Sequence, residues 1–254
     1  MAELSGKIAL VTGGGSGLGR AIALAFAREG ARVLVAGRRA DRLEETVRSG
    51  PEGALRAASA DVTRDEDRQR LIRICAEEMG GLDILVNCAG ILQGGTSETT
   101  DLDAWDRSMD INLRSIFALS RLALPALIAR KGCIINLSSV AGLRPYPGIL
   151  AYCVSKAAVD QLTRCMAVEL GPKGVRVNAI NPGVVVTDLH TTGGMSAPDY
   201  AAFLERSKTT HPLGRPGQPE EVASLALFLA SDRAGWITGT TSSIDGGRAL
   251  ASAR

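Results

Sequence analysis

Short apolar runs alternate with amphipathic stretches along the chain, and this alternation constrains the fold more than any other feature of the sequence. The first four runs lie at 7–13, 32–37, 54–61 and 82–87, and helix-like stretches at 18–30, 40–49 and 64–79 separate them. Three more runs lie at 133–139, 175–183 and 241–247, again separated by long helices. Strands of nearly continuous Val, Ile and Leu are buried on both faces, as in a parallel sheet between two layers of helices.

This arrangement predicts an α/β, doubly wound Rossmann-type fold with a central parallel sheet of about seven strands, flanked by helices on both faces. A chain of 254 residues with 45% apolar content can form one core of this class, so we expect a single domain over 1–254. Segment 189–215 breaks the alternation, because it holds one weak helical stretch between Gly-, Ser-, Thr- and Pro-rich flanks. We expect it to be a substrate-binding lid, with plain surface decoration as the alternative.

Two helix starts can be placed from local signals. Thr63 and Glu66 have the spacing of a capping box and predict the start of the helix at 64–79. The last helix is expected to begin at Pro219, with Glu220 and Glu221 against its positive end.

The charge balance points to small-molecule partners. Basic and acidic residues number 29 and 27, and no run of like charge is long enough to indicate a nucleic-acid or membrane surface. The apolar run near the N-terminus is too short for a signal peptide, and no later stretch is expected to span a membrane. The resulting expectation is a cytoplasmic protein.

Neither the cysteines nor the histidines predict a metal site or a disulfide framework. The five cysteines have no Cys-x-x-Cys or Cys/His ligand spacing, so reduced thiols are expected. His190 and His211 lie in no recognisable motif, and we interpret both as loop residues.

The helices near 101–129 and 152–170 are apolar around much of their circumference. One face of each helix would cover the sheet. We expect a second subunit to cover the remaining apolar surface. The alternative is burial by the domain's own loops.

A glycine-rich turn follows the first strand and opens the first helix. Read from Thr12, its pattern is T-G-x-x-x-G-x-G, with Gly13, Gly17 and Gly19. Such a turn brings backbone N–H groups to a pyrophosphate at a positive helix N-terminus, at the sheet edge where open α/β folds bind ligands. This spacing differs from G-x-G-x-x-G, and a plain strand-to-helix turn is the alternative.

Tyr152 and Lys156 stand four residues apart in a stretch that otherwise reads as a buried helix. Four residues is just over one turn, so both side chains leave the same helix face. An unperturbed tyrosine has a pKa near 10, and the Lys156 ammonium is expected to favour the phenolate. An isolated pair of this kind could also be a surface tyrosine packed on a lysine stem. Cys153 leaves a different face and is expected to pack rather than react.

These motifs, in this order, resemble those of the short-chain dehydrogenase/reductase family, in its shorter-chained branch, similar to 3-oxoacyl thioester and carbonyl reductases. The resemblance covers essentially the whole chain. The matching coenzyme-binding positions are Thr12, Gly13, Ser16, Gly17, Leu18 and Gly19 in the loop, Asp61 and Val62 at the adenine ring, Asn87, Ala89 and Gly90 beside the central strand, and Pro182, Gly183, Val184 and Thr187 at the nicotinamide carboxamide.

The resemblance also implies a catalytic set of Asn112, Ser139, Tyr152 and Lys156. Tyr152 would exchange a proton with the substrate oxygen, and Ser139 would donate a hydrogen bond to the same oxygen. Lys156 would also bind the nicotinamide ribose, and Asn112 would hold a water that relays protons to Lys156. A homotetramer is the implied assembly.

The end of the second strand predicts the choice of cofactor. Gly37 stands where NAD-preferring relatives carry an acid, which would repel a 2′-phosphate. Arg38 and Arg39 follow at once, and their guanidiniums suit bidentate contact with a phosphate. NADP(H) is therefore favoured and NAD(H) remains possible, since Ser16 occupies a place where many NADP-users carry a basic residue.

The favoured function is an oxidoreductase that transfers hydride between a nicotinamide cofactor and a carbonyl or secondary alcohol. Alternatives are an NAD-dependent hydroxyacyl, steroid or polyol dehydrogenase, an enoyl reductase, and a catalytically silent cofactor-binding scaffold. The sequence does not name the substrate: the lid shows no Arg cluster dedicated to a carboxylate or phosphate, although Arg206, Lys208 and Arg215 are nearby.

Overall fold

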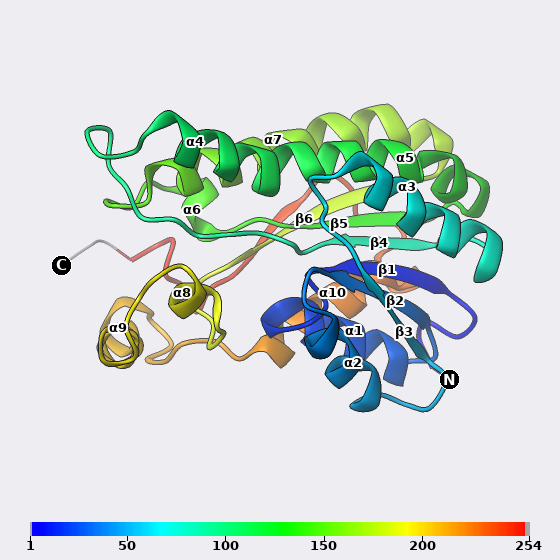
Figure 1. Ribbon diagram of the computed structural model, residues 1–254, viewed down its shortest axis with the longest axis horizontal. Helices are drawn as coiled ribbons and strands as arrows, with labels where there is room; N and C mark the ends of the chain where they lie inside the picture. The colour runs from blue at the N-terminus through cyan, green and yellow to red at the C-terminus, as the bar shows by residue number, and fades with distance from the viewer. Residues whose placement is uncertain (1, 252–254) are drawn as a thin grey trace.

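The computed structural model describes residues 2–251, and within them the predicted parallel sheet is confirmed (Figure 1). Its seven strands lie in the order β3-β2-β1-β4-β5-β6-β7, and every neighbouring pair is parallel. The strands are β1 (Ile8–Thr12), β2 (Arg32–Gly37), β3 (Leu55–Ser59), β4 (Ile84–Asn87), β5 (Cys133–Leu137), β6 (Arg176–Pro182) and β7 (Thr241–Ile244). The chain reverses its direction across the sheet between β1 and β4, which is where open α/β sheets bind ligands at the strands' carboxyl ends.

Two layers of helices cover the sheet (Figure 1). One face packs against α1 (Gly17–Arg28), α2 (Ala40–Arg48) and α10 (Pro219–Ala230). The other face packs against α3 (Asp65–Arg73), α5 (Ser115–Arg130) and α7 (Leu150–Leu170), and α4 (Leu102–Met109) lies in the same layer beside α7. Two short helices, α6 (Val140–Leu143) and α8 (Leu189–Thr192), and the longer α9 (Ala197–Thr210) lie beyond the carboxyl ends of the strands.

Alternate residues of each strand supply the two cores, because successive side chains point to opposite faces. Val11 and Val33 belong to the core that contains Phe26 of α1. Leu10 and Leu34 belong to the core that contains Leu119 of α5. The strands are therefore apolar on both sides, which is the pattern that the sequence showed.

The predicted capping box at Thr63 is wrong. The helix begins at Asp65 with Arg64 as its N-cap, and no side chain caps it. The Thr63 hydroxyl instead donates to the Asp61 carboxylate at 2.7 Å. This local turn before the helix engages the hydroxyl that the predicted capping box would have used. The helix at 64–79 also changes character, because a π-helical turn (Ile74–Glu78) follows α3.

The start of α10 is as predicted, with Pro219 in its first turn and Glu220 and Glu221 at its positive end. In addition, Gln218 and Glu221 form a capping box that the sequence analysis did not identify.

The helix predicted at 101–129 consists of α4, a π-helical turn (Asp110–Arg114) and α5. By length and composition this continuous helix, Leu102–Arg130, is long and apolar enough to cross a membrane, contrary to the expectation from sequence. Ile116, Leu119 and Leu127 are nevertheless buried within the protein, as in the core helix of a globular domain.

Segment 189–215 is more helical than predicted, and the interpretation of His190 as a loop residue is wrong, whereas His211 does lie outside the helices. Helix α9 has 14 residues and begins at a proper cap, where Ser196 accepts from the Asp199 N–H. His190 lies in α8, with its ring 4.6 Å from that of Phe203. His211 directly follows α9, is only 2% exposed and accepts a hydrogen bond from the Val184 N–H at 3.2 Å. The positions of both imidazole rings depend on contacts with other segments, which the local sequence does not reveal.

Candidate functional site

The predicted coenzyme loop closes tightly against the end of β4. Buried Thr12 accepts hydrogen bonds from the N–H groups of Cys88 (3.0 Å) and Ala89 (3.1 Å). Gly13 has a φ of +68°, and a Cβ there would lie 3.0 Å from the Ala89 nitrogen. Glycine is therefore required at this position both for its backbone conformation and for the close approach.

The start of α1 fits a phosphate-bearing cofactor. Ser16 is its N-cap but makes no side-chain capping bond, and the first turn contains no acidic residue. A Cβ on Gly19 would lie only 2.3 Å from the Gly13 carbonyl oxygen, so helix and loop touch backbone to backbone. The turn thus leaves uncapped N–H groups at a positive helix end, which suits a pyrophosphate.

Two further predicted contacts flank this loop. Asp61 accepts from the N–H and hydroxyl of Thr63, and next to it Val62 is buried. Burial alone would raise the pKa of Asp61, but these two hydrogen bonds, together with the charge of Arg38, lower the pKa. Asn87 points into the protein instead, where its amide donates to Asn136 (2.9 Å) and Ser120 (3.1 Å). Asn87 therefore steadies the junction of β4, β5 and α5.

The two arginines after β2 have different neighbours. Arg39 donates to the Ser16 hydroxyl at 3.2 Å and lies 3.6 Å from an Asp188 carboxylate oxygen. The charge of Arg38 acts on Asp61, which follows β3, on the far side of β2 from the coenzyme loop. Both arginines are exposed. Next to them, a Cβ at Gly37 would meet only the Leu43 side chain, at 3.6 Å, so there is room around this position.

The predicted catalytic side chains meet at the carboxyl ends of β4, β5 and β6. Tyr152 and Lys156 leave the same face of α7, and the Lys156 ammonium lies 5.6 Å from the centre of the Tyr152 ring. Ser139 caps α6 and faces them from the end of β5. Lys156 donates to the Leu137 carbonyl at 2.7 Å. All three side chains are at least nine-tenths buried.

The expectation that Lys156 lowers the pKa of Tyr152 is wrong for the protein without ligand. Burial raises the pKa of Tyr152 to about 12, although the hydrogen-bonding hydroxyl of Ser139 acts in the opposite direction. Burial also lowers the pKa of Lys156 to about 8. Loss of water around both groups therefore outweighs their mutual attraction, and the phenol is neutral at physiological pH.

Asn112 is fully buried in the π-helical turn between α4 and α5, and its side chain is already engaged. Its oxygen accepts from the Ile91 N–H (2.8 Å), and its amide donates to the Ile91 carbonyl (3.0 Å) and the Ser155 hydroxyl (3.1 Å). The side chain thus ties the loop after β4 to α7. A Cβ on Gly90 would meet the Asn112 oxygen at 3.2 Å and the Lys156 nitrogen at 3.8 Å. The loop after β4 therefore passes close to the side chains of both Asn112 and Lys156.

The segment after β6 completes the ring around the site. Pro182 ends the strand, and a Cβ on Gly183 would lie 2.9 Å from the Asp245 Cα. The backbone of Thr187 exchanges two hydrogen bonds with the Tyr200 hydroxyl, at 3.1 and 2.7 Å. A Cβ on Gly17 would meet Thr187 at 3.3 Å, so the loop after β6 reaches the coenzyme loop.

Asp160 and Asn181 stand behind the site and were missed by the sequence analysis. The Asn181 amide donates to both Asp160 carboxylate oxygens (3.1 and 2.9 Å) and to the Ser139 carbonyl (2.9 Å). Asp160 lies one turn beyond Lys156 on α7, and that i+4 spacing was the available signal. This pair therefore fixes the main chain of Ser139.

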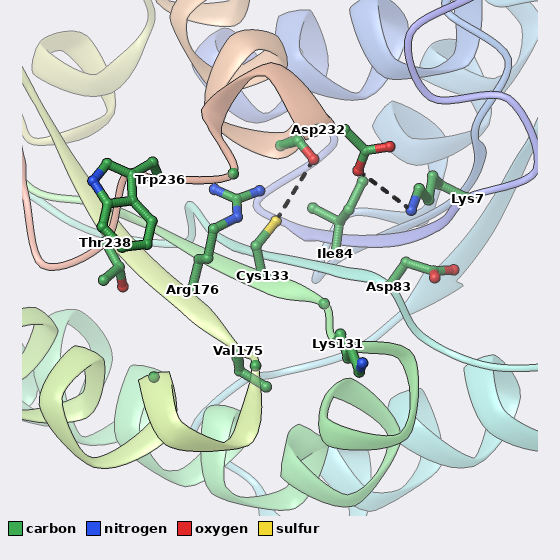
Figure 2. A pocket seen from close by; sticks show the side chains of 15 residues that line it. Lys7, Asp83, Ile84, Lys131, Cys133, Val175, Arg176, Asp232, Trp236 and Thr238 are labelled. Atoms are coloured by element: carbon green, nitrogen blue, oxygen red, sulfur yellow. Dashed lines mark hydrogen bonds and ion pairs between the residues drawn. The ribbon is translucent and has the colours of Figure 1, made fainter.

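A cavity of about 630 Å³ opens at the opposite edge of the sheet, at the amino ends of the strands (Figure 2). It holds none of the predicted site residues. Arg176 donates there to the carbonyls of Leu229 and Ser231, and Lys7 lies 3.8 Å from Asp232. These cations offset the carbonyl ends of helices that finish at this edge, which is a structural role.

Comparisons with known proteins agree with this geometry. A family model described as enoyl-(acyl carrier protein) reductase matches residues 13–249. The chain is 42% identical to 3beta-hydroxysteroid dehydrogenase 1 of Eggerthella lenta, over 98% of this chain and 95% of that protein. It is 37% identical to meso-2,3-butanediol dehydrogenase of Serratia marcescens, over 95% and 94%. A solved Caenorhabditis elegans short-chain dehydrogenase/reductase of unknown function, with cofactor, superposes with a TM-score of 0.93 at 34% identity, covering 98% of this chain and 97% of that one.

Proposed function

The chain belongs to the short-chain dehydrogenase/reductase family, and we propose that it interconverts a ketone or aldehyde with an alcohol, using NADP(H) in preference to NAD(H). Relatives of this kind are oxidoreductases that act on alcohols and carbonyls, which supports the general activity. The observation that carries the proposal is the convergence of Tyr152, Ser139 and Lys156, all nearly buried, beside a glycine loop built to accept a pyrophosphate.

The bound nicotinamide supplies or accepts the hydride. In the reducing direction Tyr152 gives its proton to the substrate oxygen, and a neutral phenol is the form this step needs. Ser139 donates a hydrogen bond to the same oxygen and stabilises the charge that develops on it. Lys156 holds its ammonium one turn away and stabilises the phenolate that proton transfer leaves behind.

We assign the preference for NADP(H) to Arg38 and Arg39. Arg39 already reaches the coenzyme loop at Ser16, and Gly37 puts no carboxylate beside it. Asp188 is the counter-charge that Arg39 meets in its present position, and a 2′-phosphate would compete for the same guanidinium. Hydrogen bonds to a charged group contribute about 1.5–3 kcal/mol, so one such contact implies roughly ten- to a hundredfold preference.

We further propose a homo-oligomer, with a tetramer as the family resemblance implies, in the cytoplasm. The outer faces of α5 and α7 expose Phe117 (49%), Val154 (39%) and Val168 (78%), which a second subunit would cover. Light scattering at working concentration tests this, and a stable monomer would overturn it.

The central experiment measures turnover of NADPH and NADH with ketones, diketones, steroids, sugars and 3-oxoacyl thioesters, with an enoyl thioester included. Tyr152→Phe keeps the ring but removes the proton, so turnover of the best substrate should fall by about 10²–10⁴ while cofactor still binds. A near-normal rate in the variant would refute the proton-donor role. Turnover of the enoyl thioester alone would favour the enoyl reductase alternative, and cofactor binding without turnover would favour the scaffold.

A further inference from the structure

Two arginines that are distant in sequence lie against one tyrosine ring close to the catalytic tyrosine. The guanidinium carbon of Arg144 is 5.6 Å from the centre of the Tyr146 ring, and that of Arg248 is 5.0 Å from it. Arg144 and Tyr146 lie between α6 and α7, whereas Arg248 comes from the segment after β7. We refer to Arg144, Tyr146 and Arg248 as the arginine cluster.

The arginine cluster borders the place where a substrate must sit to reach Tyr152. Tyr146, Leu92 and Ile149 pack in one cluster with Tyr152. On the lid side, Arg248 donates to the Thr210 hydroxyl at 2.9 Å, and its charge acts on His190. The lid, the loop before α7 and the C-terminal segment therefore meet at these arginines.

Among residues 2–251, the cluster concentrates positive charge without a neutralising acid. Both arginines are half-buried, and within residues 2–251 neither forms an ion pair. Arg144 donates through one nitrogen to the carbonyls of Arg248, Ala249 and Ala251, at 3.5, 3.3 and 2.5 Å. Asp245 is the acid closest in sequence to Arg248, and its carboxylate is taken by the N–H groups of Gly247 (3.0 Å) and Ala249 (2.7 Å). Two like charges against one ring repel each other, and a bound anion would relieve that repulsion.

Further polar atoms in this region have no partner among the described residues. The buried hydroxyl of Tyr146 and the buried Nδ1 of His190 each lack a hydrogen-bond partner in residues 2–251. Burial first, and the charge of Arg248 second, lower the pKa of His190, so its ring is neutral at physiological pH. Buried polar groups are normally satisfied, so the open Tyr146 hydroxyl, in the same packing cluster as Tyr152, is available for a ligand. A guanidinium has five N–H donors, and most of those on Arg144 and Arg248 are not engaged by acceptors within residues 2–251.

We propose that the arginine cluster is an oxyanion subsite, and that the substrate is a ketone or secondary alcohol carrying a carboxylate, sulfonate or phosphate remote from the reacting carbon. This inference rests on the proposed function and names the substrate class for the same site. Arg248 and Arg144 bind the oxyanion, and the Tyr146 hydroxyl donates to it. The site therefore selects charged over neutral substrates at the end of the molecule away from Tyr152.

Matched substrate pairs test the proposal. A series of aliphatic keto acids, from 4-oxopentanoate to 8-oxononanoate, is compared with the corresponding methyl esters, and one keto phosphonate and one keto sulfonate distinguish the kinds of oxyanion. We expect at least one acid to exceed its ester in kcat/KM by about ten- to a hundredfold, through hydrogen bonds to a charged group. Equal kcat/KM for every acid and its ester would overturn the subsite and leave the oxidoreductase proposal standing. No turnover of any carbonyl compound would instead refute the proposed function.

Charge-removing variants locate the effect. Arg248→Gln and Arg144→Gln should each reduce the acid-to-ester ratio about tenfold or more while the ester keeps its kcat/KM, which shows that the variant is folded and active. Tyr146→Phe keeps the ring and should reduce the ratio less. Lys173→Gln, on the exposed turn that follows α7, removes an equal charge far from the site and should leave the ratio unchanged. A ratio that stays at the wild-type value in both arginine variants would overturn the assignment.

Discussion

Replacing Gly19 with alanine tests whether the turn after β1 is built by direct contact of backbone with backbone. The new Cβ would lie 2.3 Å from the Gly13 carbonyl oxygen and 2.6 Å from its carbon, and neither atom belongs to a flexible side chain. Helix α1 or the loop must therefore shift by several tenths of an ångström. Overpacking of this kind costs about 1–3 kcal/mol, and the better helix propensity of alanine offsets at most about 1 kcal/mol.

We expect the Gly19→Ala protein to lose about 1–2 kcal/mol of stability, which lowers its Tm by roughly 2–8 °C. Because the shift moves the N–H groups that face the cofactor, the Kd for NADPH should rise about tenfold or more. Thermal unfolding with and without NADPH, and calorimetric titration, measure both effects. Gly171→Ala is the matched control, since it has helical φ and ψ of −53° and −45° and nothing within 4 Å of the new Cβ. A Gly19→Ala protein with wild-type Tm and Kd would show that the turn is not so tightly constrained.

Three further predictions concern the cofactor, the lid and the last helix. Gly37→Asp combined with Arg38→Ala should shift the ratio of kcat/KM from NADPH toward NADH, and a wild-type protein that favours NADH would show this interpretation of the arginines to be wrong. Segment 189–215 should exchange amide hydrogens faster without ligand than with cofactor and substrate, and identical exchange would remove its role as a lid. Glu221→Ala should destabilise the protein by about 0.5–2 kcal/mol at neutral pH, because it removes half of the α10 capping box. The Arg215 hydrogen bonds lower the pKa of Glu221 to about 2, so this stabilisation is present above pH 4.5 and lost as the pH falls toward 2; equal unfolding of both proteins by urea at pH 7 would contradict it.

The sheet could be predicted because each strand carries its signal locally. Runs such as Ile8–Thr12 are buried at every position, and a buried run reads as apolar whatever lies beside it. The tyrosine and lysine pair could be predicted for the same reason, since helical spacing alone puts both side chains on one face. Helix starts were less reliable: the Thr63 hydroxyl had a second acceptor two residues back, and sequence does not decide between the two.

Properties that depend on several segments could not be predicted from the sequence. Arg248 lies more than one hundred residues beyond Tyr146, and only the folded chain brings their side chains together. The direction of the Tyr152 pKa shift was also mispredicted, because spacing gives the distance to Lys156 but not the burial that both groups undergo. Burial arises from the whole fold, including Leu92, Tyr146 and Ile149 around the ring.

Burial of the Lys156 ammonium lowers the stability of the folded protein. Burial lowers the pKa of Lys156 from 10.5 to about 8, so between these pH values the unfolded chain binds more protons than the folded one. Stability therefore rises with pH across this window, and below pH 8 the charged lysine costs on the order of 3 kcal/mol. Lys156→Met removes that cost and gives up the hydrogen bond to Leu137, which is about 1 kcal/mol.

We expect Lys156→Met to abolish turnover yet to be more stable than wild type by about 1–2 kcal/mol at pH 7. Its advantage should shrink as the pH rises from 8 toward 10.5, because wild-type Lys156 then becomes neutral in both states. The pKa of Tyr152 and that of Cys88, both raised by burial to about 12, make each protein lose stability in more alkaline solution. Because that loss occurs in both proteins, the change in the difference between their urea unfolding free energies from pH 7 to pH 9.5 reports on Lys156 and its effect on Cys88. A variant that is less stable at pH 7, or a difference that does not change with pH, would mean that burial of the charged Lys156 ammonium carries no such cost in the free protein.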